Sequence, residues 1–217
     1  MTALAQGFTN PVLDCQSCYR AVLDAMSRPA LPVRLPVLPP LPVPGGAFGS
    51  GMAALALTLC DGETPLWLQP ELRSEALHAY LRFHCGSPIT ADPGLAAFAF
   101  IISPLTMPPL NAFAQGSAVC PEQSATLILS ARLSGPADVL AAGPGIGGPE
   151  TGRDTARPLA CRGLPPTFVE QWQDNRQAYP LGVDVLLLDD NLSDNGPIMA
   201  GLPRTTGIRP MPQKSES

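Results

Sequence analysis

The chain has 217 residues and a net charge of −5; 45% of its residues are hydrophobic and only 14% are charged. A chain this apolar can bury a core, so wholesale disorder is excluded, and the acidic balance argues against nucleic-acid binding. No apolar run approaches the roughly 18 residues of a membrane span, and the first ten residues lack the basic and apolar regions of a secretory signal. We therefore expect a cytoplasmic protein that binds neither nucleic acid nor membrane.

The first predicted element is a helix that begins after Asp14, as N-cap, and ends at Arg28-Pro29. Arg20 and Asp24 are spaced to form an ion pair on one face of this helix. Apolar residues at helical spacing predict its buried face: Cys15, Tyr19, Val22, Leu23 and Met26.

Residues 30–46 hold six prolines, which forbid a helix and allow at most an edge strand or a polyproline segment. Gly49-Ser50-Gly51 then opens a second helix that runs to about Leu59. A short strand is predicted over residues 66–68. A third helix is predicted over residues 71–84, with Leu72, Ala76, Tyr80 and Phe83 on one side, and Gly86 ends it.

The second half of the chain alternates predicted strands and helices. Residues 183–188 are a continuous apolar run, which is typical of a central strand. Residues 143–166 are rich in Gly and Pro and predict a long loop. The other expected elements are strands over residues 98–102, 125–133, 139–142 and 198–202, and helices over residues 110–115 and 167–176.

This alternation predicts an α/β fold with a mixed central sheet flanked by helices. We expect one domain over residues 1–210 and a flexible polar tail over residues 211–217.

The only lysine is Lys214, in the tail. Without an internal lysine the chain cannot form a Schiff base or a P-loop, which excludes pyridoxal phosphate (PLP) enzymes and P-loop ATPases. Residues 143–148 fit the letters of G-x-G-x-x-G, but poor helix formers follow, so a strand-to-loop turn is the better interpretation. We expect no cofactor.

The sequence contains no convincing catalytic or metal set. Its two histidines have no clustered carboxylates near them, which leaves a metal ion little to bind. Cys15-x-x-Cys18 is a lone pair, so we expect all six cysteines to be free, metal-free thiols. Asp189-Asp190 is most simply a solvated turn.

Two arginine-bearing segments remain as candidate anion or partner sites. Arg82 and His84 end the third helix, where they either complement the helix dipole or bind a phosphate or a partner carboxylate. Pro203-Arg204-Thr205-Thr206 follows a predicted strand and can hold a phosphate oxygen or anchor a carboxylate across an interface. Their residue types do not decide between these roles.

Several segments, in order, resemble one family. They are Tyr19-Arg20 and Met26-Ser27-Arg28-Pro29 within residues 8–29, residues 57–61 and 64–68, Leu81-Arg82-Phe83-His84, residues 116–118 with 121–122 and 125–129, Gly143-Pro144-Gly145-Ile146, residues 179–184, and Pro203-Arg204-Thr205-Thr206. In that order they resemble PhnH, the H subunit of the bacterial carbon–phosphorus lyase system, and the resemblance extends over about residues 8–209. Residues 30–46 and the enlarged loop over residues 147–162 depart from the usual pattern, but neither touches a motif.

The resemblance implies a fold like the large domain of PLP-dependent transferases, without PLP. It implies that the G, H, I and L subunits together make ribose 1-phosphonate 5-triphosphate from ATP and an alkylphosphonate, displacing adenine. It also implies a core complex of the G, H, I and J subunits, in which the H subunit has no established activity of its own. Through their place in these motifs, Arg20, Arg82, His84, Arg204, Thr205 and Thr206 become candidate anion- or partner-binding residues.

Two rival functions stay open from the residues alone. One is an autonomous phosphate-ester or nucleotide-binding enzyme that uses Arg82, His84 and Arg204, and the other is a purely structural scaffold.

We also expect a homodimer in isolation, because the low charge leaves much apolar surface and the resembled family pairs through a two-fold contact. The apolar residues of the proline-rich segment are its candidate interface: Leu31, Val33, Leu35, Val37 and Leu41. The alternative is that this segment packs on its own sheet.

Overall fold

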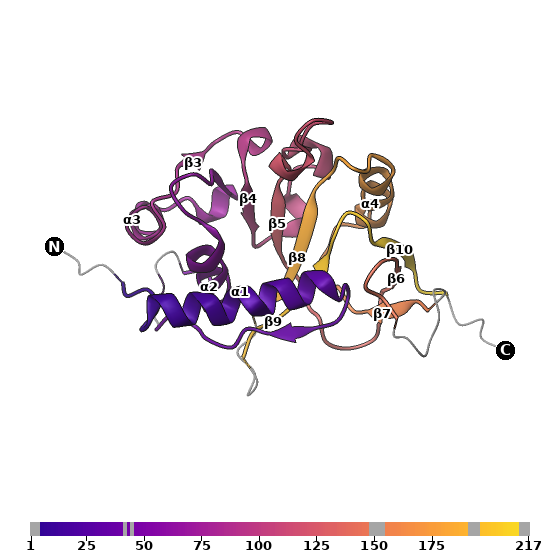
Figure 1. The fold of residues 1–217 in the computed structure, drawn as a ribbon, viewed down its shortest axis with the longest axis horizontal. Coiled ribbons are helices and arrows are strands. Elements are labelled where there is room, and N and C mark those ends of the chain that lie inside the picture. Colours follow the sequence, from indigo (N-terminus) through magenta and orange to yellow (C-terminus); the bar gives the residue numbers. More distant parts are fainter. Residues whose placement is uncertain (1–4, 41–42, 44–45, 148–154, 191–195, 213–217) are drawn as a thin grey trace.

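The computed structural model of the chain describes residues 5–40, 43, 46–147, 155–190 and 196–212. A seven-stranded sheet forms the centre of the molecule (Figure 1). Its strands, in spatial order, are β1 (Val33–Arg34), β9 (Ile198–Leu202), β8 (Asp184–Asp189), β5 (Thr126–Ser130), β4 (Phe98–Ile101), β2 (Leu66–Leu68) and β3 (Ile89–Thr90). The five strands from β8 to β3 are parallel, and β9 runs antiparallel to both β8 and β1. The predicted mixed α/β fold is confirmed.

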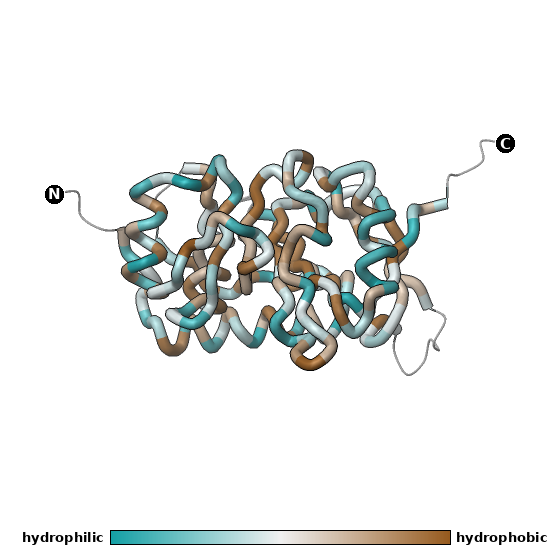
Figure 2. Tube along the Cα trace, turned by 90° about the horizontal axis from the view of Figure 1, so that it is seen from above, coloured by the Kyte–Doolittle hydropathy of each residue, from teal (hydrophilic) through white to brown (hydrophobic). Residues whose placement is uncertain are grey.

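Both faces of this sheet are covered, which explains why its central strands are continuously apolar. Alternate residues face opposite sides: Leu186 and Leu188 of β8 pack with the three helices α1 (Pro11–Ser27), α2 (Ser50–Leu59) and α3 (Glu75–His84). Val185 and Leu187 pack with α4 (Phe168–Gln177) and a second sheet. In Figure 2 the hydrophobic stretches run through the middle of the molecule, where these strands lie.

The second sheet is a small antiparallel one beside α4, in the order β10 (Gly207–Pro210), β6 (Val139–Ala142), β7 (Arg157–Leu159) (Figure 1). The sequence predicted β6 but neither of its partners, and β7 lies inside the region expected to be a loop. Strand β7 was not predicted because it contains Pro158. Proline is tolerated in a sheet only at an edge strand, and β7 lies at the edge of the small sheet.

Helix α1 begins one turn earlier than predicted, because Asn10 and not Asp14 is its N-cap. The Asn10 side chain accepts a hydrogen bond from Leu13 N (3.4 Å), and the Asp14 carboxylate accepts one from Asn10 N (2.8 Å). This reciprocal arrangement satisfies two backbone donors, as in a capping box.

The buried face of α1 also differs from the prediction: it is formed by Cys18, Val22 and Ala25, while Tyr19 and Leu23 are 49% and 51% exposed. These small side chains allow α1 to lie close against β9 and α2. Asp24 pairs with Arg28 rather than with Arg20.

Helix α3 is shorter than predicted. Residues 70–72 form a separate 3₁₀ turn, and α3 begins after Ser74, whose side chain accepts a hydrogen bond from Leu77 N (3.2 Å). Its buried residues are Leu77, Tyr80 and Leu81, whereas Phe83 is 71% exposed. The short helix expected over residues 110–115 is a 3₁₀ turn over Leu110–Ala112.

The proline-rich segment contributes the edge strand β1, which pairs with β9. Leu35 is only 3% exposed, and its backbone N–H donates to Pro197 O (3.0 Å). The expectation that Leu35 lies on an exposed dimer surface is therefore wrong, because this side chain belongs to the core of its own subunit. Leu41, Lys214 and most of the predicted tail lie outside the described residues.

None of the helices in the described part of the chain is long and apolar enough to cross a membrane.

Candidate functional site

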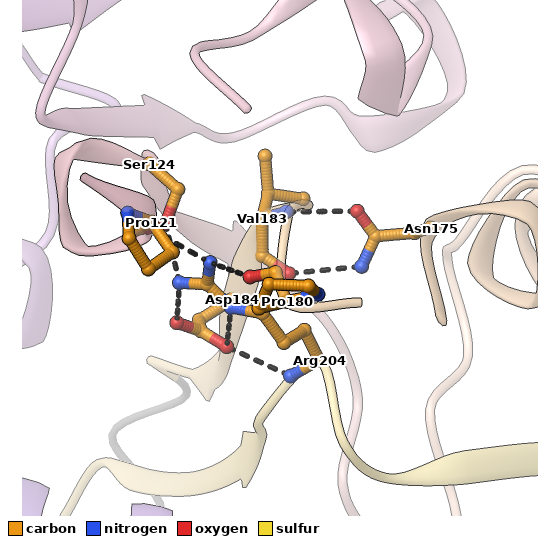
Figure 3. Close-up of polar contacts among 7 residues, drawn as sticks. All are labelled: Pro121, Ser124, Asn175, Pro180, Val183, Asp184 and Arg204. Atoms are coloured by element: carbon orange, nitrogen blue, oxygen red, sulfur yellow. Dashed lines mark hydrogen bonds and ion pairs between the residues drawn. The ribbon is translucent and has the colours of Figure 1, made fainter. Parts of the chain in front are cut away.

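Arg204 lies in the turn between β9 and β10, where it ties three loops together (Figure 3). Its backbone N–H and its Nε donate to Asp184 Oδ1 (2.7 and 3.2 Å), and its Nη2 donates to Asp184 Oδ2 (2.5 Å). Its Nη1 donates to Pro121 O and Pro180 O (both 3.1 Å), and Nη2 also donates to the Ser124 hydroxyl.

A guanidinium has five N–H donors, and these contacts occupy all five. The ion pair is largely buried, with 14% of the Arg204 side chain and 20% of the Asp184 side chain exposed. Binding of an anion by Arg204 would therefore require one of these bonds to be released. The arrangement favours a role in holding the loops around residues 121–124, 180 and 204.

The two threonines that follow are placed differently. Thr205 is partly exposed, while Thr206 is fully buried. The Thr206 carbonyl accepts a hydrogen bond from Trp172 Nε1 (2.7 Å), and its N–H donates to Pro203 O (2.7 Å). Nearby, the Asn175 side chain bonds both backbone groups of Val183 (Figure 3), so this corner of the sheet is rigidly held.

His84, in the last turn of α3, fastens the N-terminal segment to that helix. Its Nε2 lies 2.9 Å from Ala5 O, and because a carbonyl only accepts, Nε2 carries the proton. The imidazole packs against the rings of Tyr80 and Phe83, at 4.6 and 5.0 Å between centroids. It lines a cavity of about 600 Å³ with residues 5–8, Cys15 and Leu57.

Arg82 and Arg20 are exposed, on α3 and α1 respectively. The predicted candidates thus occupy three separate places: α1, the end of α3 and the β9–β10 turn. The cavity beside His84 is lined by no candidate residue from α1 or from the β9–β10 turn.

A second cavity, of about 620 Å³, lies at the carboxyl ends of the parallel strands. Its wall includes residues 102–105 after β4, Ser130 to Arg132 at the end of β5, Asp189 and Asp190 at the end of β8, and Arg162. In open α/β sheets ligands bind at this edge. Sequence patterns did not point to these residues, although an arginine at position 132, near the end of the strand predicted over residues 125–133, is a signal that could have found Arg132.

Asp190 is not the solvated turn that we expected. Its carboxylate accepts hydrogen bonds from Gly51 N (2.9 and 3.1 Å) and Met52 N (3.4 Å) at the N-terminus of α2. A Cβ on Gly49 would lie 1.9 Å from Asp190 Oδ2, so the Gly49-Ser50-Gly51 motif makes room for this carboxylate. Burial raises the pKa of Asp190, and the hydrogen bonds from α2 oppose that shift.

Two further side chains fix the rim of this cavity. Gln69 is buried, and its amide bonds Ile102 N, Ser103 N and Ser103 O after β4. Asp189 is also buried and accepts a hydrogen bond from Leu133 N (2.9 Å) after β5. The strand ends are therefore preorganised around the cavity.

No group of three or more His, Cys, Asp or Glu side chains within the described ranges is placed to hold a metal ion. All six cysteines are free thiols. Burial raises the pKa of Cys85 and of Cys161 to about 12, which keeps both thiols protonated and weakly nucleophilic at neutral pH.

Comparison with known proteins identifies the family. The family model described as bacterial phosphonate metabolism protein (PhnH) matches residues 6–209. A relative from Rhizobium meliloti (strain 1021) is 33% identical over 192 residues, which cover 86% of this chain and 91% of the relative. That relative is named alpha-D-ribose 1-methylphosphonate 5-triphosphate synthase subunit PhnH. The chain therefore belongs to the PhnH family of bacterial phosphonate metabolism proteins.

Proposed function

We propose that this chain is a non-autonomous subunit of a carbon–phosphorus lyase assembly, required with the G, I and L subunits to form ribose 1-phosphonate 5-triphosphate from ATP and an alkylphosphonate. The observation that carries this proposal is the family match over residues 6–209, together with a relative that is named as a synthase subunit.

The side chains support a role as a subunit rather than as an enzyme acting alone. The two histidines offer little for catalysis, since His84 is bonded to the N-terminal segment and His78 lies on another turn of α3. Arg204 has all five donors engaged with Asp184, Ser124 and two carbonyls. An autonomous enzyme built on Arg82, His84 and Arg204 would have to join groups that the fold keeps on separate elements.

A subunit must also offer surface to its partners. The outward side of α1 carries four of the ten large apolar side chains that are exposed in the described residues: Val12 (71%), Leu13 (58%), Tyr19 (49%) and Leu23 (51%). Exposed apolar patches commonly mark protein interfaces. We place the contact with the G, I or J subunits, or with a second copy in a cytoplasmic homodimer, on this face and not on the proline-rich segment.

Co-expression with tagged G, I and J subunits tests the proposal. The wild-type chain is expected to co-purify with them, and the isolated chain is expected to release no adenine from ATP and methylphosphonate. Leu23→Asp should weaken co-purification, whereas Leu95→Asp, at a 66% exposed site in a different segment, is the matched control. Adenine release by the chain alone, or failure of the wild type to join the other subunits, would contradict it.

A further inference from the structure

Arg132 and Arg162 are paired through their backbones where the two sheets meet. Arg132 follows β5 of the large sheet and Arg162 follows β7 of the small one. They form an isolated antiparallel bridge in which Arg132 N donates to Arg162 O (2.9 Å) and Arg162 N donates to Arg132 O (3.1 Å). Residues opposite each other in such a bridge project to the same face and are neighbours.

Two like charges in this position destabilise a folded protein, and the nearby acids compensate for them poorly. Arg162 Nε lies 4.0 Å from Asp138 Oδ1, with 53% and 39% of the two side chains exposed, so this ion pair is weak. Asp138 Oδ2 already accepts from Cys161 N (2.8 Å). Within the residues that the structure describes, the Arg132 guanidinium has no hydrogen bond or ion pair.

The two carboxylates in the same cavity wall are also engaged elsewhere. Asp190 accepts from the first backbone N–H groups of α2, and Asp189 accepts from Leu133 N. The basic residues in the wall of the cavity of about 620 Å³ are Arg132 and Arg162, at the sheet edge where α/β proteins bind ligands.

We propose that Arg132 and Arg162 form a two-arginine clamp for a dianionic phosphoryl or phosphonyl group at the carboxyl edge of the large sheet. Paired guanidinium groups present planar arrays of N–H donors that match the oxygens of such a group. A bound dianion also replaces the repulsion between the two cations with attraction to both. The clamp itself is inferred from the bridge and the cavity, and only the choice of a phosphorus oxyanion over a carboxylate rests on the proposed function.

The clamp can be tested on the purified full-length chain by calorimetric titration with inorganic phosphate, methylphosphonate, ribose 5-phosphate and succinate. Arg132→Gln and Arg162→Gln should each weaken phosphonate and phosphate binding by at least about tenfold, the loss of one charge-assisted contact. Arg209→Gln, which removes an exposed arginine of β10, should leave binding within about twofold.

Thermal unfolding gives a second measurement that a purely structural arginine would not reproduce. Without ligand, Arg132→Gln should melt at the wild-type temperature or above it, because repulsion is relieved. Methylphosphonate should raise the melting temperature of the wild type but not of the variant.

The proposal is overturned if the wild type shows no saturable binding of any phosphorus oxyanion, if both glutamine variants bind like the wild type, or if Arg132→Gln is equally destabilised with and without ligand. Succinate binding as tight as that of methylphosphonate would overturn the phosphorus assignment. Co-purification with the G, I and J subunits does not depend on these results, so failure of the clamp and failure of the proposed function can be distinguished.

Discussion

Arg204→Ala is the substitution that tests the structural account most directly. It removes the five donors that Arg204 supplies and leaves the Asp184 carboxylate, 80% shielded from solvent, without its charged partner. It also removes the hydrogen bonds that Arg204 donates to the carbonyl oxygens of Pro121 and Pro180. Breaking a buried ion pair by removing one partner costs about 3–5 kcal/mol. In a protein of this length that corresponds to a fall in melting temperature of roughly 6–20 °C.

Urea unfolding followed by tryptophan fluorescence measures this loss, because Trp172 is bonded to Thr206, two residues from the substituted position. Arg34→Ala, at an exposed arginine of β1, is the matched control and should change the unfolding free energy by less than about 0.5 kcal/mol. Arg204→Lys should recover only part of the stability, since an ammonium cannot reproduce the planar five-donor pattern. A loss below about 1 kcal/mol for Arg204→Ala would refute the reasoning.

Three further predictions concern single residues. Burial raises the pKa of Asp190 above its ordinary value of 3.8, so the folded state holds this proton more tightly than the unfolded chain does. The unfolding free energy of the wild type should therefore fall relative to that of Asp190→Asn as the pH rises from about 3.8 through the raised pKa of the folded state. A difference in unfolding free energy between the two proteins that does not change with pH, measured by urea titration, would contradict this. Gly145→Ala should cost more than about 2 kcal/mol, because a Cβ there lies 2.3 Å from the last carbonyl of α1. Gly163→Ala, at a similar positive φ in open space, should cost only about 1 kcal/mol, and equal losses in urea unfolding would rule out the clash. Alkylation of Cys85 at about pH 8 should be slow in the native protein and fast in urea, because burial raises its thiol pKa to about 12; equal rates by mass spectrometry would contradict this.

The sequence by itself determined the class of fold and the position of most central elements. The strands β2, β6 and β9 have the predicted bounds, and β8 and α4 lie within one or two residues of them. These elements carry a strong local signal, either a continuous apolar run or helical spacing between turn residues. Such a signal arises from neighbours along the chain, so it can be recognised without the tertiary structure.

Only the tertiary structure decided which polar side chains are engaged in stabilising the fold and which are available to a ligand. Arg204 was a candidate because of its residue type, but partners up to 83 residues away occupy its donors. Asp190 resembled a surface turn until the fold placed it against α2, 139 residues away. Arg132 and Arg162 carry no shared motif and become neighbours because a backbone bridge joins the two sheets. Each of these outcomes depends on contacts between distant segments, and local patterning does not encode which segments meet.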